Sequence, residues 1–499
     1  MGEAVDMSKP RLKRSPGGSA KREAMSRVDT AWLRMERPTN PMMITGVLML
    51  DEPMTLAALK QVIKKRFLAY ARFRQKPVDG PTGASWQDDP DFDLDWHVRL
   101  SGLPGRGDGP AAQKRALQRF VGQLASSPLD PHKPLWQFHL VERYGGGSAI
   151  VARIHHCYAD GIALVQVLLS LTDAERKPGK TEPLPKTWLK QEGAAVARRV
   201  GAVDRYMRLG GKMLGKGMEM VQAPTLAGVL AKEGGEIARE LVHALSLPDD
   251  PPSMLRGRLG VSKRVAWAEP LKLEEVKAVG RACDCTVNDV LMATAAGALR
   301  EYMRERGEAL DGMTLRATVP VNLRPLEHAR KLGNHFGLVF LDLPVGEANP
   351  VRRLERVADC MRQLKGSRQA IVAYGLLAAL GMAPAAVQEL ALDLFSRKAT
   401  AVATNVPGPQ QPLYLAGRKL REMMFWVPQT GSIGIGVSIL SYDGEVHFGL
   451  IADARLIPDP QDVIRRFGEE FDKLLYLALM ADWSGMLDAQ AASALMTGD

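Results

Sequence analysis

The sequence predicts a mixed α/β fold that is divided into two lobes. Three observations lead to this prediction: the chain has 499 residues, each half alternates strand-like and helical runs, and a stretch of different composition separates the halves. A single hydrophobic core stops growing at roughly 250 to 300 residues, so a chain of this length is expected to build two. Hydrophobic residues make up 46% and charged residues 24%, as in ordinary globular proteins.

The first half of the chain is predicted to contain three helices and two strands. Apolar residues recur at helical spacing in the helical segments, and the strand segments are short apolar runs. In order, the predicted elements are a helix at 56–67, a helix at 110–126, strands at 136–141 and 148–154, and a helix at 162–173. This order makes the first half a mixed α/β unit.

The second half is predicted to resume the alternation after residue 260. Thr286 or Asn288 is expected to open a helix that runs to Tyr302. Near the C-terminus, Asp443 and Gly444 separate two apolar runs, and an Asp-Gly pair in this position is the strongest short-range signal for a β-hairpin. The other predicted elements are a strand at 264–268, a helix at 272–283, a strand at 315–321 and the hairpin strands at 433–441 and 446–452.

The stretch between residues 176 and 260 differs in composition from both halves. It is rich in Pro and Gly, as linkers between domains are. Residues 186–220 hold eight basic and three acidic residues, a surplus of five, which is half of the net charge of +10. Interleaved apolar residues fit an amphipathic helix on a membrane surface or a solvated helix packed on the protein. No helix-turn-helix, zinc-finger or aromatic-basic pattern accompanies the charge, so nucleic acid is not an expected partner.

These changes in composition predict four regions. Residues 1–24 are expected to form a disordered basic tail, because Lys and Arg alternate there with Gly, Ser and Pro, and the apolar core of a secretory signal is missing. The N-terminal lobe is placed at 25–180, a basic and partly helical linker at 181–259, and the C-terminal lobe at 260–499.

Cysteine content and hydropathy indicate a reducing compartment and peripheral rather than spanning membrane attachment. Four cysteines in so long a chain cannot build a dense disulfide framework. The most apolar stretch, 371–388, is free of charge and just long enough to span a bilayer, but Gly375, Gly381 and Pro384 interrupt it. We therefore interpret this stretch as a buried helix or as the wall of an apolar channel.

The segment from Ala149 to Gly161 has the pattern most indicative of catalysis. An apolar strand runs directly into His155 and His156, and a short turn with Asp160 leads into a helix. A rigid strand end can aim a side chain into a cleft, and a neutral imidazole can take a proton from a hydroxyl that attacks a carbonyl. Taken alone, the same residues also fit two buried histidines beside an ordinary turn. No further ligands at zinc spacing lie nearby, so a metal site is not expected.

The motif His155-His156-Cys157-Tyr158-Ala159-Asp160-Gly161 resembles the His-His-x-x-x-Asp-Gly motif of the bacterial wax ester synthase/acyl-CoA:diacylglycerol acyltransferase family. Its core, His-x-x-x-Asp, is similar to that of chloramphenicol-acetyltransferase-like and peptide-condensation enzymes. The resemblance runs from about Ser26 to the C-terminus. Further segments that resemble family segments, in family order, are Ser26-Arg-Val-Asp29-Thr-Ala-Trp32, Pro38-Thr39-Asn40-Pro41-Met42, Pro134-Leu135-Trp136, Thr286-Val-Asn288-Asp289-Val-Leu291, Pro320-Val-Asn322-Leu-Arg324, Gly333-Asn334 and Asn405-Val-Pro407-Gly408-Pro409.

The resemblance implies roles for the histidines and the aspartate of the motif. His156, four residues before Asp160, is the expected general base, which deprotonates the acceptor alcohol and then protonates the thiolate of coenzyme A, without a covalent acyl-enzyme. Asp160 is expected to orient this histidine, because a carboxylate of ordinary pKa is too weak a base for an alcohol. His155 is a supporting residue that either positions the substrate or packs.

The resemblance also places Asn288 and Asp289 near the active site. The Asn288 amide is expected to hydrogen-bond the acceptor or the developing oxyanion, and Asp289 and Gly161 are expected to help bind substrate. The alternative for Asn288 is a plain N-cap, since asparagine is common at helix starts. The segment that begins at Asn405 is expected to shape the interface between the lobes, and we assign it no chemical step.

Taken together, the resemblance implies two chloramphenicol-acetyltransferase-like lobes, with mixed sheets flanked by helices and an active-site tunnel between the lobes. The expected reaction transfers a long-chain acyl group from acyl-CoA to a fatty alcohol, to diacylglycerol or to both. Acyl-CoA is then a substrate, and no cofactor is expected. The expected location is cytoplasmic, peripherally associated with a membrane or lipid droplet. The alternatives are another hydroxyl or amine acceptor on the same fold, or a non-catalytic lipid-binding protein, for which an intact His156, Asp160 and Asn288 would have no use.

Overall fold

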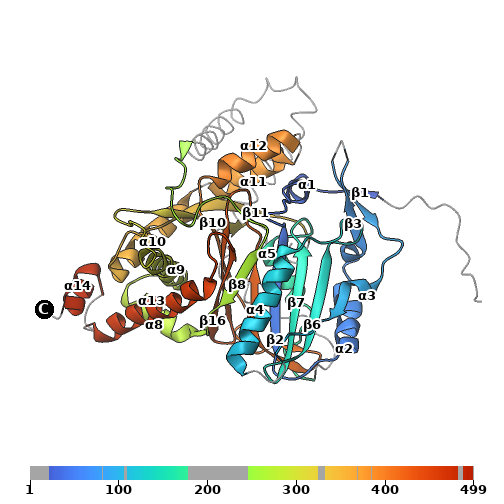
Figure 1. The fold of residues 1–499 in the computed structure, drawn as a ribbon, viewed down its shortest axis with the longest axis horizontal. Coiled ribbons are helices and arrows are strands. Elements are labelled where there is room, and N and C mark those ends of the chain that lie inside the picture. Colours follow the sequence, from blue (N-terminus) through green and yellow to red (C-terminus); the bar gives the residue numbers. More distant parts are fainter. Residues whose placement is uncertain are drawn as a thin grey trace, which may run out of the picture.

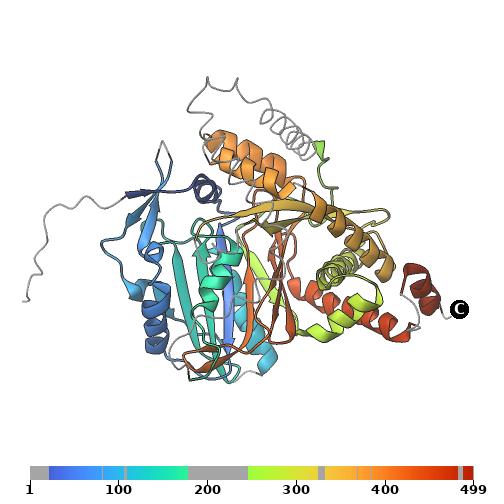
Figure 2. The same ribbon diagram turned by 180° about the vertical axis from the view of Figure 1, so that it is seen from behind.

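Two large β-sheets lie side by side in the computed structural model, with helices packed around them (Figures 1 and 2). The predicted fold class, mixed sheets flanked by helices, is confirmed. The predicted tail up to residue 21 and most of the predicted linker, including its basic stretch, lie outside the described residues. The structure describes residues 22–80, 83–105, 109–177, 246–323, 332–367, 369–381, 383, 385–481 and 487–497.

All five elements predicted for the first half are present. The helix expected at 56–67 is an α-helix that continues as a π-helical turn, and the helix expected at 162–173 ends at Leu169, because Asp173 turns to pair with Tyr414. The elements are β1 (Arg22–Ala24), α1 (Arg27–Arg34), β2 (Met43–Leu50), α2 (Leu56–Val62), the π-helical turn Ile63–Phe67, a 3-10 turn at Ala71–Arg74, β3 (Gln75–Val78), β4 (Ser85–Asp88), α3 (Leu94–His97), β5 (Val98–Leu100), α4 (Pro110–Ser126), β6 (Trp136–Tyr144), β7 (Gly147–His155) and α5 (Gly161–Leu169).

The strand β2 lies near the middle of the six-stranded sheet and was not predicted. Its residues alternate between two apolar clusters: Ile44 and Leu48 pack on one face of the sheet, and Val47 and Met49 pack on the other. Because both faces are covered, the strand is an uninterrupted apolar run that is buried throughout. Such a run lacks the alternation of apolar and polar residues that marks a half-exposed strand.

Three residues of the predicted disordered tail are ordered. Arg22–Ala24 form β1, which pairs antiparallel with β4, and β4 in turn pairs with β3. The prediction of disorder is therefore wrong for these residues. A strand edge offers unpaired backbone groups whatever the side chains are, so the composition of the tail could not reveal the pairing.

The second half contributes the remaining elements, and the helix expected near Thr286 begins there, with Thr286 as its N-cap. They are β8 (Lys263–Trp267), β9 (Leu271–Lys272), α8 (Leu273–Ala282), α9 (Val287–Arg304), β10 (Leu315–Asn322), β11 (Phe336–Leu343), α10 (Pro350–Gly366), α11 (Gln369–Leu380), α12 (Ala385–Ser396), β12 (Ala401–Pro407), β13 (Tyr414–Leu415), β14 (Arg418–Trp426), β15 (Ile435–Tyr442), β16 (Glu445–Asp453), α13 (Pro460–Met480) and α14 (Ala489–Thr497).

The predicted C-terminal hairpin is confirmed as β15 and β16, which pair antiparallel in the seven-stranded sheet. The order of this sheet is β11-β10-β12-β15-β16-β8, and β9 also pairs with β16. The turn residues Asp443 and Gly444 have φ of 50° and 81°. Positive φ at both central positions matches the right-handed twist of the paired strands, which is why Asp-Gly is favoured there.

Two strands of the second half belong to the sheet of the first half. The six-stranded sheet has the order β13-β14-β2-β7-β6-β5, and β14 pairs antiparallel with β2 from Leu420↔Leu50 to Trp426↔Thr45. The predicted lobe boundaries near residues 180 and 260 therefore do not coincide with the boundary between the two sheets. The exchange fixes the two sheets relative to each other, since β14 also contacts β15 and β16.

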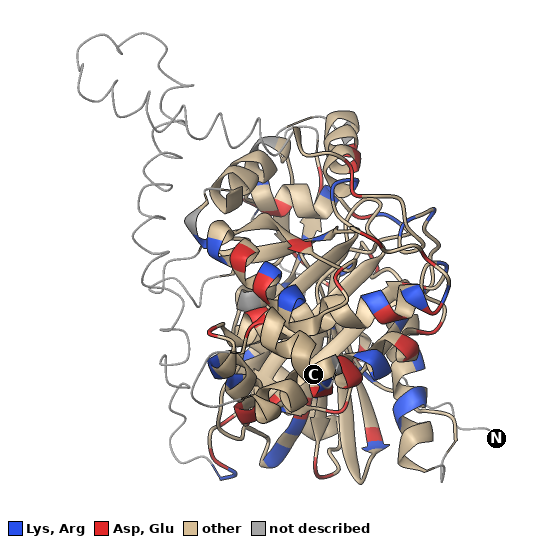
Figure 3. Cartoon of the chain, turned by 90° about the vertical axis from the view of Figure 1, so that its left-hand side faces the viewer, with Lys and Arg blue, Asp and Glu red and all other residues tan. Residues whose placement is uncertain are grey.

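Helices α9 and α13 pack against each other on the seven-stranded sheet, and oppositely charged side chains join them. Arg306 pairs with Asp462 at 2.6 Å, and Arg466 pairs with Glu305. Figure 3 shows basic and acidic residues interspersed over this side of the molecule rather than gathered by sign. Exposed pairs of this kind each contribute little to stability, about 0 to 1 kcal/mol.

The apolar stretch at 371–388 forms parts of two helices rather than one. α11 packs on β11 and on α1, and α12 begins at residue 385. At Gly381, where α11 ends, a Cβ atom would lie 1.8 Å from the Arg27 carbonyl oxygen, so only glycine fits beside α1. The interpretation as a buried helix holds for part of α11 only: Val372, Leu377 and Ala378 are buried, whereas Tyr374 and Leu376 are half-buried and Gly375 is exposed. Within the described ranges, no helix is long and apolar enough to cross a membrane.

Candidate active site

The His-His-x-x-x-Asp-Gly motif forms the turn between β7 and α5. β7 ends at His155, and α5 begins at Gly161 with Asp160 as its N-cap; Asp160 Oδ1 accepts a hydrogen bond of 2.8 Å from the Ala163 N–H. The backbone N–H of His156 donates to the Met42 carbonyl oxygen at 2.7 Å, at the start of the neighbouring strand. The turn is thus held by the sheet on one side and by the helix on the other.

His156 is almost fully buried and is packed between rings. Its imidazole is stacked on Trp32, with 4.1 Å between the ring centroids and 25° between the planes, and Phe336 lies at 5.6 Å. Burial lowers the pKa of His156 to about 4, although the nearby Asp160 carboxylate opposes this shift. The imidazole is therefore neutral at pH 7 and can accept a proton. Nδ1 of this imidazole is buried.

His155 points to a different partner from His156. Its Nδ1 accepts a hydrogen bond of 3.1 Å from the Cys157 N–H, so Nε2 carries the proton and donates to Glu36 at 2.7 Å. Burial is the largest single effect on the pKa of Glu36 and raises it, but the hydrogen bond and charge of His155 and the hydrogen bond from the Met42 N–H together outweigh burial, so the pKa is lowered. His155 therefore anchors the turn to the segment after α1.

A segment of the second half clamps the catalytic turn. The Gly333 N–H donates to the Tyr158 carbonyl at 3.0 Å, and the His335 N–H donates to Asp160 Oδ2 at 3.1 Å. The Asn334 side chain donates to the His156 carbonyl at 2.9 Å and to Asp29 Oδ1 at 2.8 Å. In the sequence, Gly333-Asn334 and the segment with Asp29 were recognisable only as segments that resemble family segments. Their convergence on the turn appears only in the tertiary structure.

A cavity lies beside His156 between the two sheets. The parallel strands β10 and β12 pair only at Ala317↔Ala401 and Thr318↔Val402 and then part. The cavity opens where they part, and His156 faces it from the first sheet. Its lining is mostly apolar and comprises Trp32, His156, Asp160, Gly161, Thr318, Pro320, Phe336, Leu338, Val402, Thr404, Asn405, Val406, Phe425, Val427, Pro428 and Thr430.

Asn288 reaches the cavity only through a second asparagine. Its Oδ1 accepts a hydrogen bond of 2.7 Å from Nδ2 of Asn405, and Asn405, on β12, lines the cavity. Asp289 lies on the helix side: its Oδ2 accepts hydrogen bonds from the Thr286 N–H and hydroxyl, which completes a capping box at the start of α9. Neither Asn288 nor Asp289 belongs to the lining, and these contacts favour a capping role for Asp289.

Gly161 does line the cavity, and Val427 would crowd a side chain at this position. A Cβ atom there would lie 3.1 Å from Cγ1 of Val427 across the cavity. The structure thus brings His156, Asp160 and Gly161 together at the cavity. His155, Asn288 and Asp289 lie behind these lining residues and do not line the cavity themselves.

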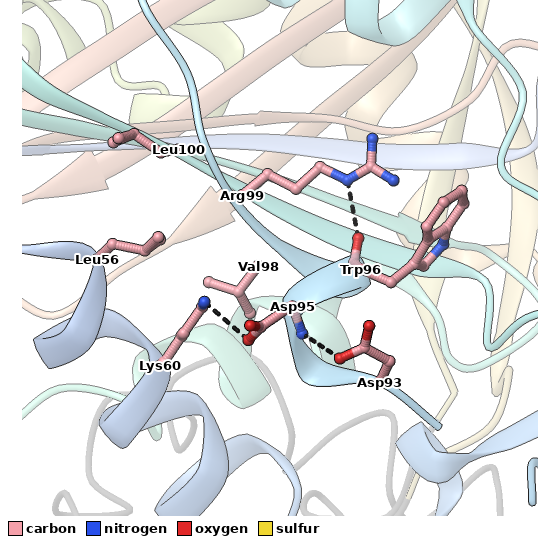
Figure 4. Close-up of a pocket in the computed structure, with 8 residues that line it drawn as sticks. All are labelled: Leu56, Lys60, Asp93, Asp95, Trp96, Val98, Arg99 and Leu100. Atoms are coloured by element: carbon pink, nitrogen blue, oxygen red, sulfur yellow. Dashed lines mark hydrogen bonds and ion pairs between the residues drawn. The ribbon is translucent and has the colours of Figure 1, made fainter. Parts of the chain in front are cut away.

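A second pocket lies at the edge of the six-stranded sheet (Figure 4). Lys60 pairs with Asp95 at 2.8 Å, and the Arg99 side chain donates to the Trp96 carbonyl at 2.9 Å. Since these charged groups bind protein atoms and no histidine lines the pocket, it offers no equivalent of the base at the cavity. Over the part of the chain that the structure describes, no group of three or more His, Cys, Asp or Glu could hold a metal ion.

Sequence comparisons relate this chain to acyltransferases. Models of the wax ester synthase/diacylglycerol acyltransferase catalytic domain and of the WS/DGAT C-terminal domain match residues 25–291 and 332–475. A probable diacylglycerol O-acyltransferase of Mycobacterium tuberculosis, tgs1, is 29% identical over 436 residues, 86% of this chain and 89% of that protein. A putative diacylglycerol O-acyltransferase of Mycobacterium bovis is 30% identical over 458 residues, 87% of this chain and 95% of that protein.

Solved structures show the same fold. The wax ester synthase/diacylglycerol acyltransferase of Marinobacter aquaeolei VT8 superimposes with a TM-score of 0.65 at 24% identity, covering 91% of this chain and 98% of that one. A starter condensation domain of rhizomide synthetase, in complex with C8-CoA and Leu-SNAC, superimposes with a TM-score of 0.55 at 14% identity, covering 94% and 96%.

The catalytic-domain model and the related diacylglycerol O-acyltransferases show that the protein is an acyltransferase, and the two-sheet fold agrees with this class. With both family models matched along most of its length, the chain belongs to the wax ester synthase/diacylglycerol acyltransferase family.

Proposed function

We propose that the protein transfers a long-chain fatty acyl group from acyl-CoA to a fatty alcohol, to diacylglycerol or to both, with His156 as general base. The observation that carries this proposal is the neutral, buried imidazole of His156 at a largely apolar cavity between the sheets. Apolar walls suit acyl chains, and a neutral imidazole among them suits proton transfer from an acceptor hydroxyl. The names of the related proteins support these two acceptor classes.

The reaction needs one proton to move twice. Nε2 of His156 takes the proton of the acceptor hydroxyl as its oxygen attacks the thioester carbonyl. The tetrahedral oxyanion then collapses, the C–S bond breaks, and the imidazolium returns the proton to the departing thiolate of coenzyme A. The acyl group goes directly to the acceptor, so no covalent acyl-enzyme forms and no cofactor is required.

The surrounding residues hold His156 for these steps. Asp160 orients the turn through its hydrogen bonds to the Ala163 and His335 N–H groups, and its negative charge favours the imidazolium. His155 supports the turn from behind through Glu36. The Asn288–Asn405 pair offers a side-chain amide to the cavity, where it can hydrogen-bond the acceptor or the oxyanion.

We propose that the protein takes its acceptor from a cytoplasmic membrane or lipid-droplet surface to which it attaches peripherally. Fatty alcohols and diacylglycerols reside in such surfaces, and in the described residues no helix could span the bilayer. Flotation of the purified protein with liposomes that contain dioleoylglycerol tests this attachment, and recovery of the protein only in the bottom fraction at low salt would contradict it.

The test of the reaction is an assay with radiolabelled palmitoyl-CoA on purified protein, with hexadecanol and dipalmitoylglycerol offered separately. His156-dependent label in wax ester or triacylglycerol is the expected result, with His156→Ala as the inactive variant and circular dichroism to show that it is folded. Activity that survives in His156→Ala would refute the general base. If the wild type forms neither ester, the proposed acceptors are wrong, and a different hydroxyl or amine acceptor, or a non-catalytic lipid-binding role, takes their place.

A further inference from the structure

The indole of Trp32 lies face to face with the imidazole of His156. The ring centroids are 4.1 Å apart with 25° between the planes, Trp32 is 4% exposed, and both rings line the cavity. Trp32 belongs to the N-terminal segment to which the sequence assigned no chemical role.

The position of Trp32 is fixed by the same contacts that hold the catalytic turn. α1 begins at Ser26, whose side chain accepts a hydrogen bond from the Asp29 N–H. One helical turn before Trp32, Asp29 is tied through Asn334 to the His156 carbonyl. The cap of α1 and the Asn334 bridge therefore both hold Trp32 beside His156, and the stacking does not depend on a bound substrate.

When His156 takes a proton, a cation forms where water is excluded. The charged or titratable groups that act on it electrostatically are Asp160 and His155, both from its own turn. Asp29 from α1 and His335 from the segment before β11 reach the same turn through hydrogen bonds, Asp29 by way of Asn334 and the His335 N–H by way of Asp160. Asp160 favours the cation and His155 opposes it. Asp29 already accepts two hydrogen bonds from Asn334. Of the two aromatic rings described beside the imidazole, Trp32 is stacked on it at 4.1 Å, whereas Phe336 is tilted at 5.6 Å.

We propose that Trp32 stabilises the imidazolium form of His156 during proton transfer through a cation–π interaction, and so acts on the reaction through His156. The inference rests on the proposed function of His156 as the base. Tryptophan has the most negative ring face of the aromatic side chains, and the attraction is strongest where the cation is desolvated. Because the cation exists only after the proton has moved, the interaction strengthens along the reaction and raises kcat rather than substrate affinity.

The experiment replaces Trp32 by 5-fluoro-, 5,7-difluoro- and 4,5,6,7-tetrafluorotryptophan in the full-length protein. Fluorine withdraws charge from the ring face while the shape of the side chain stays nearly the same. We expect kcat to fall stepwise with the number of fluorine atoms, by about tenfold over the series, and KM to remain constant. The control is the same series at Trp267, a buried tryptophan that contacts Trp426 in the apolar cluster of Val47 and Met49. Fluorination of Trp267 should leave kcat unchanged.

The outcomes separate this inference from the proposed function. An inactive His156→Ala variant together with a flat fluorination series at Trp32 would leave the base in place and overturn the role of Trp32. An active His156→Ala variant would refute the base itself, whatever the series shows. Trp32→Leu is a second arm: if its kcat falls while the fluorinated series stays flat, Trp32 contributes packing alone and the proposal is wrong.

Discussion

Asn405 donates a hydrogen bond of 2.7 Å from its side-chain amide to Oδ1 of Asn288, and only Asn405 of the two lines the cavity. The pair joins the start of α9 to the parting strands β10 and β12. Two segments more than a hundred residues apart in the sequence therefore place one amide at the cavity.

This contact predicts that Asn288 acts through Asn405. We expect Asn405→Ala and Asn288→Ala each to lower kcat about 100- to 1,000-fold, the range for one lost transition-state donor. In the double variant the loss should equal that of Asn405→Ala alone, since Asn288 then has no partner to hold. Steady-state kinetics of the four proteins give the coupling, and additive losses would show that Asn288 contacts the substrate itself.

The burial of His156 predicts an unusual acid limb of the pH–rate profile. With its pKa lowered to about 4, the base stays neutral far below the pH at which an ordinary histidine becomes protonated. We expect kcat/KM for palmitoyl-CoA to stay level from pH 8 down to pH 5.5. Far-UV circular dichroism at each pH shows whether the protein remains folded. A loss of activity centred near pH 6.5 would mean that water reaches the imidazole in the free enzyme.

Buried histidines also make the stability depend on pH. The pKa of His447 is lowered to about 4 by burial, while an unfolded histidine has a pKa near 6.5, so the unfolded chain binds more protons between these values. The free energy of unfolding therefore falls as the pH drops from about 6.5 towards 4, by roughly 3 kcal/mol for one such group. His447→Leu should flatten this dependence in urea titrations at pH 7 and pH 5. It should leave kcat unchanged, because His447 does not line the cavity; an unaltered pH dependence would contradict the assignment.

Substitution of Asn334 is predicted to lower both the stability of the protein and its kcat. Asn334→Ala removes hydrogen bonds to the buried Asp29 carboxylate and to the His156 carbonyl, and an unpaired buried polar group costs about 1 to 3 kcal/mol. We expect a matching drop in the free energy of unfolding and a lower kcat. The matched control is Asn349→Ala, which removes the N-cap of α10. It should lower stability by about 1 kcal/mol with kcat retained. Equal effects of the two variants on kcat would show that Asn334 has only a structural role.

The close approach of Val427 to Gly161 predicts that a second substitution can restore the activity lost in Gly161→Ala. Gly161→Ala places a methyl group 3.1 Å from Cγ1 of Val427 and narrows the cavity. We expect activity with palmitoyl-CoA to fall several-fold and activity with shorter acyl-CoA to fall less, because each methylene of the chain needs room in the cavity. Val427→Ala in the same protein should restore most of the palmitoyl activity. Failure of this rescue would locate the acyl chain elsewhere.

Much of the fold could be predicted because its signals are local. The 3.6-residue periodicity of α4 and the Asp443-Gly444 turn are set by neighbouring residues, and both appeared with nearly the observed bounds. β2 could not be recognised, since a strand covered on both faces carries no alternation. The pairing of β14 with β2 was equally hidden, because strand register over long separations leaves no local mark.

The sequence by itself determined the mixed α/β class, the family and the motif that contains His156 and Asp160, because a strand-to-turn motif is read over a few adjacent positions. Only the tertiary structure decided what surrounds them. Trp32 on the imidazole, Asn334 between Asp29 and the His156 carbonyl, and Asn405 in front of Asn288 are contacts between distant segments. Such contacts exist only once the sheets and helices have packed, and they set the burial and electrostatics on which proton transfer depends.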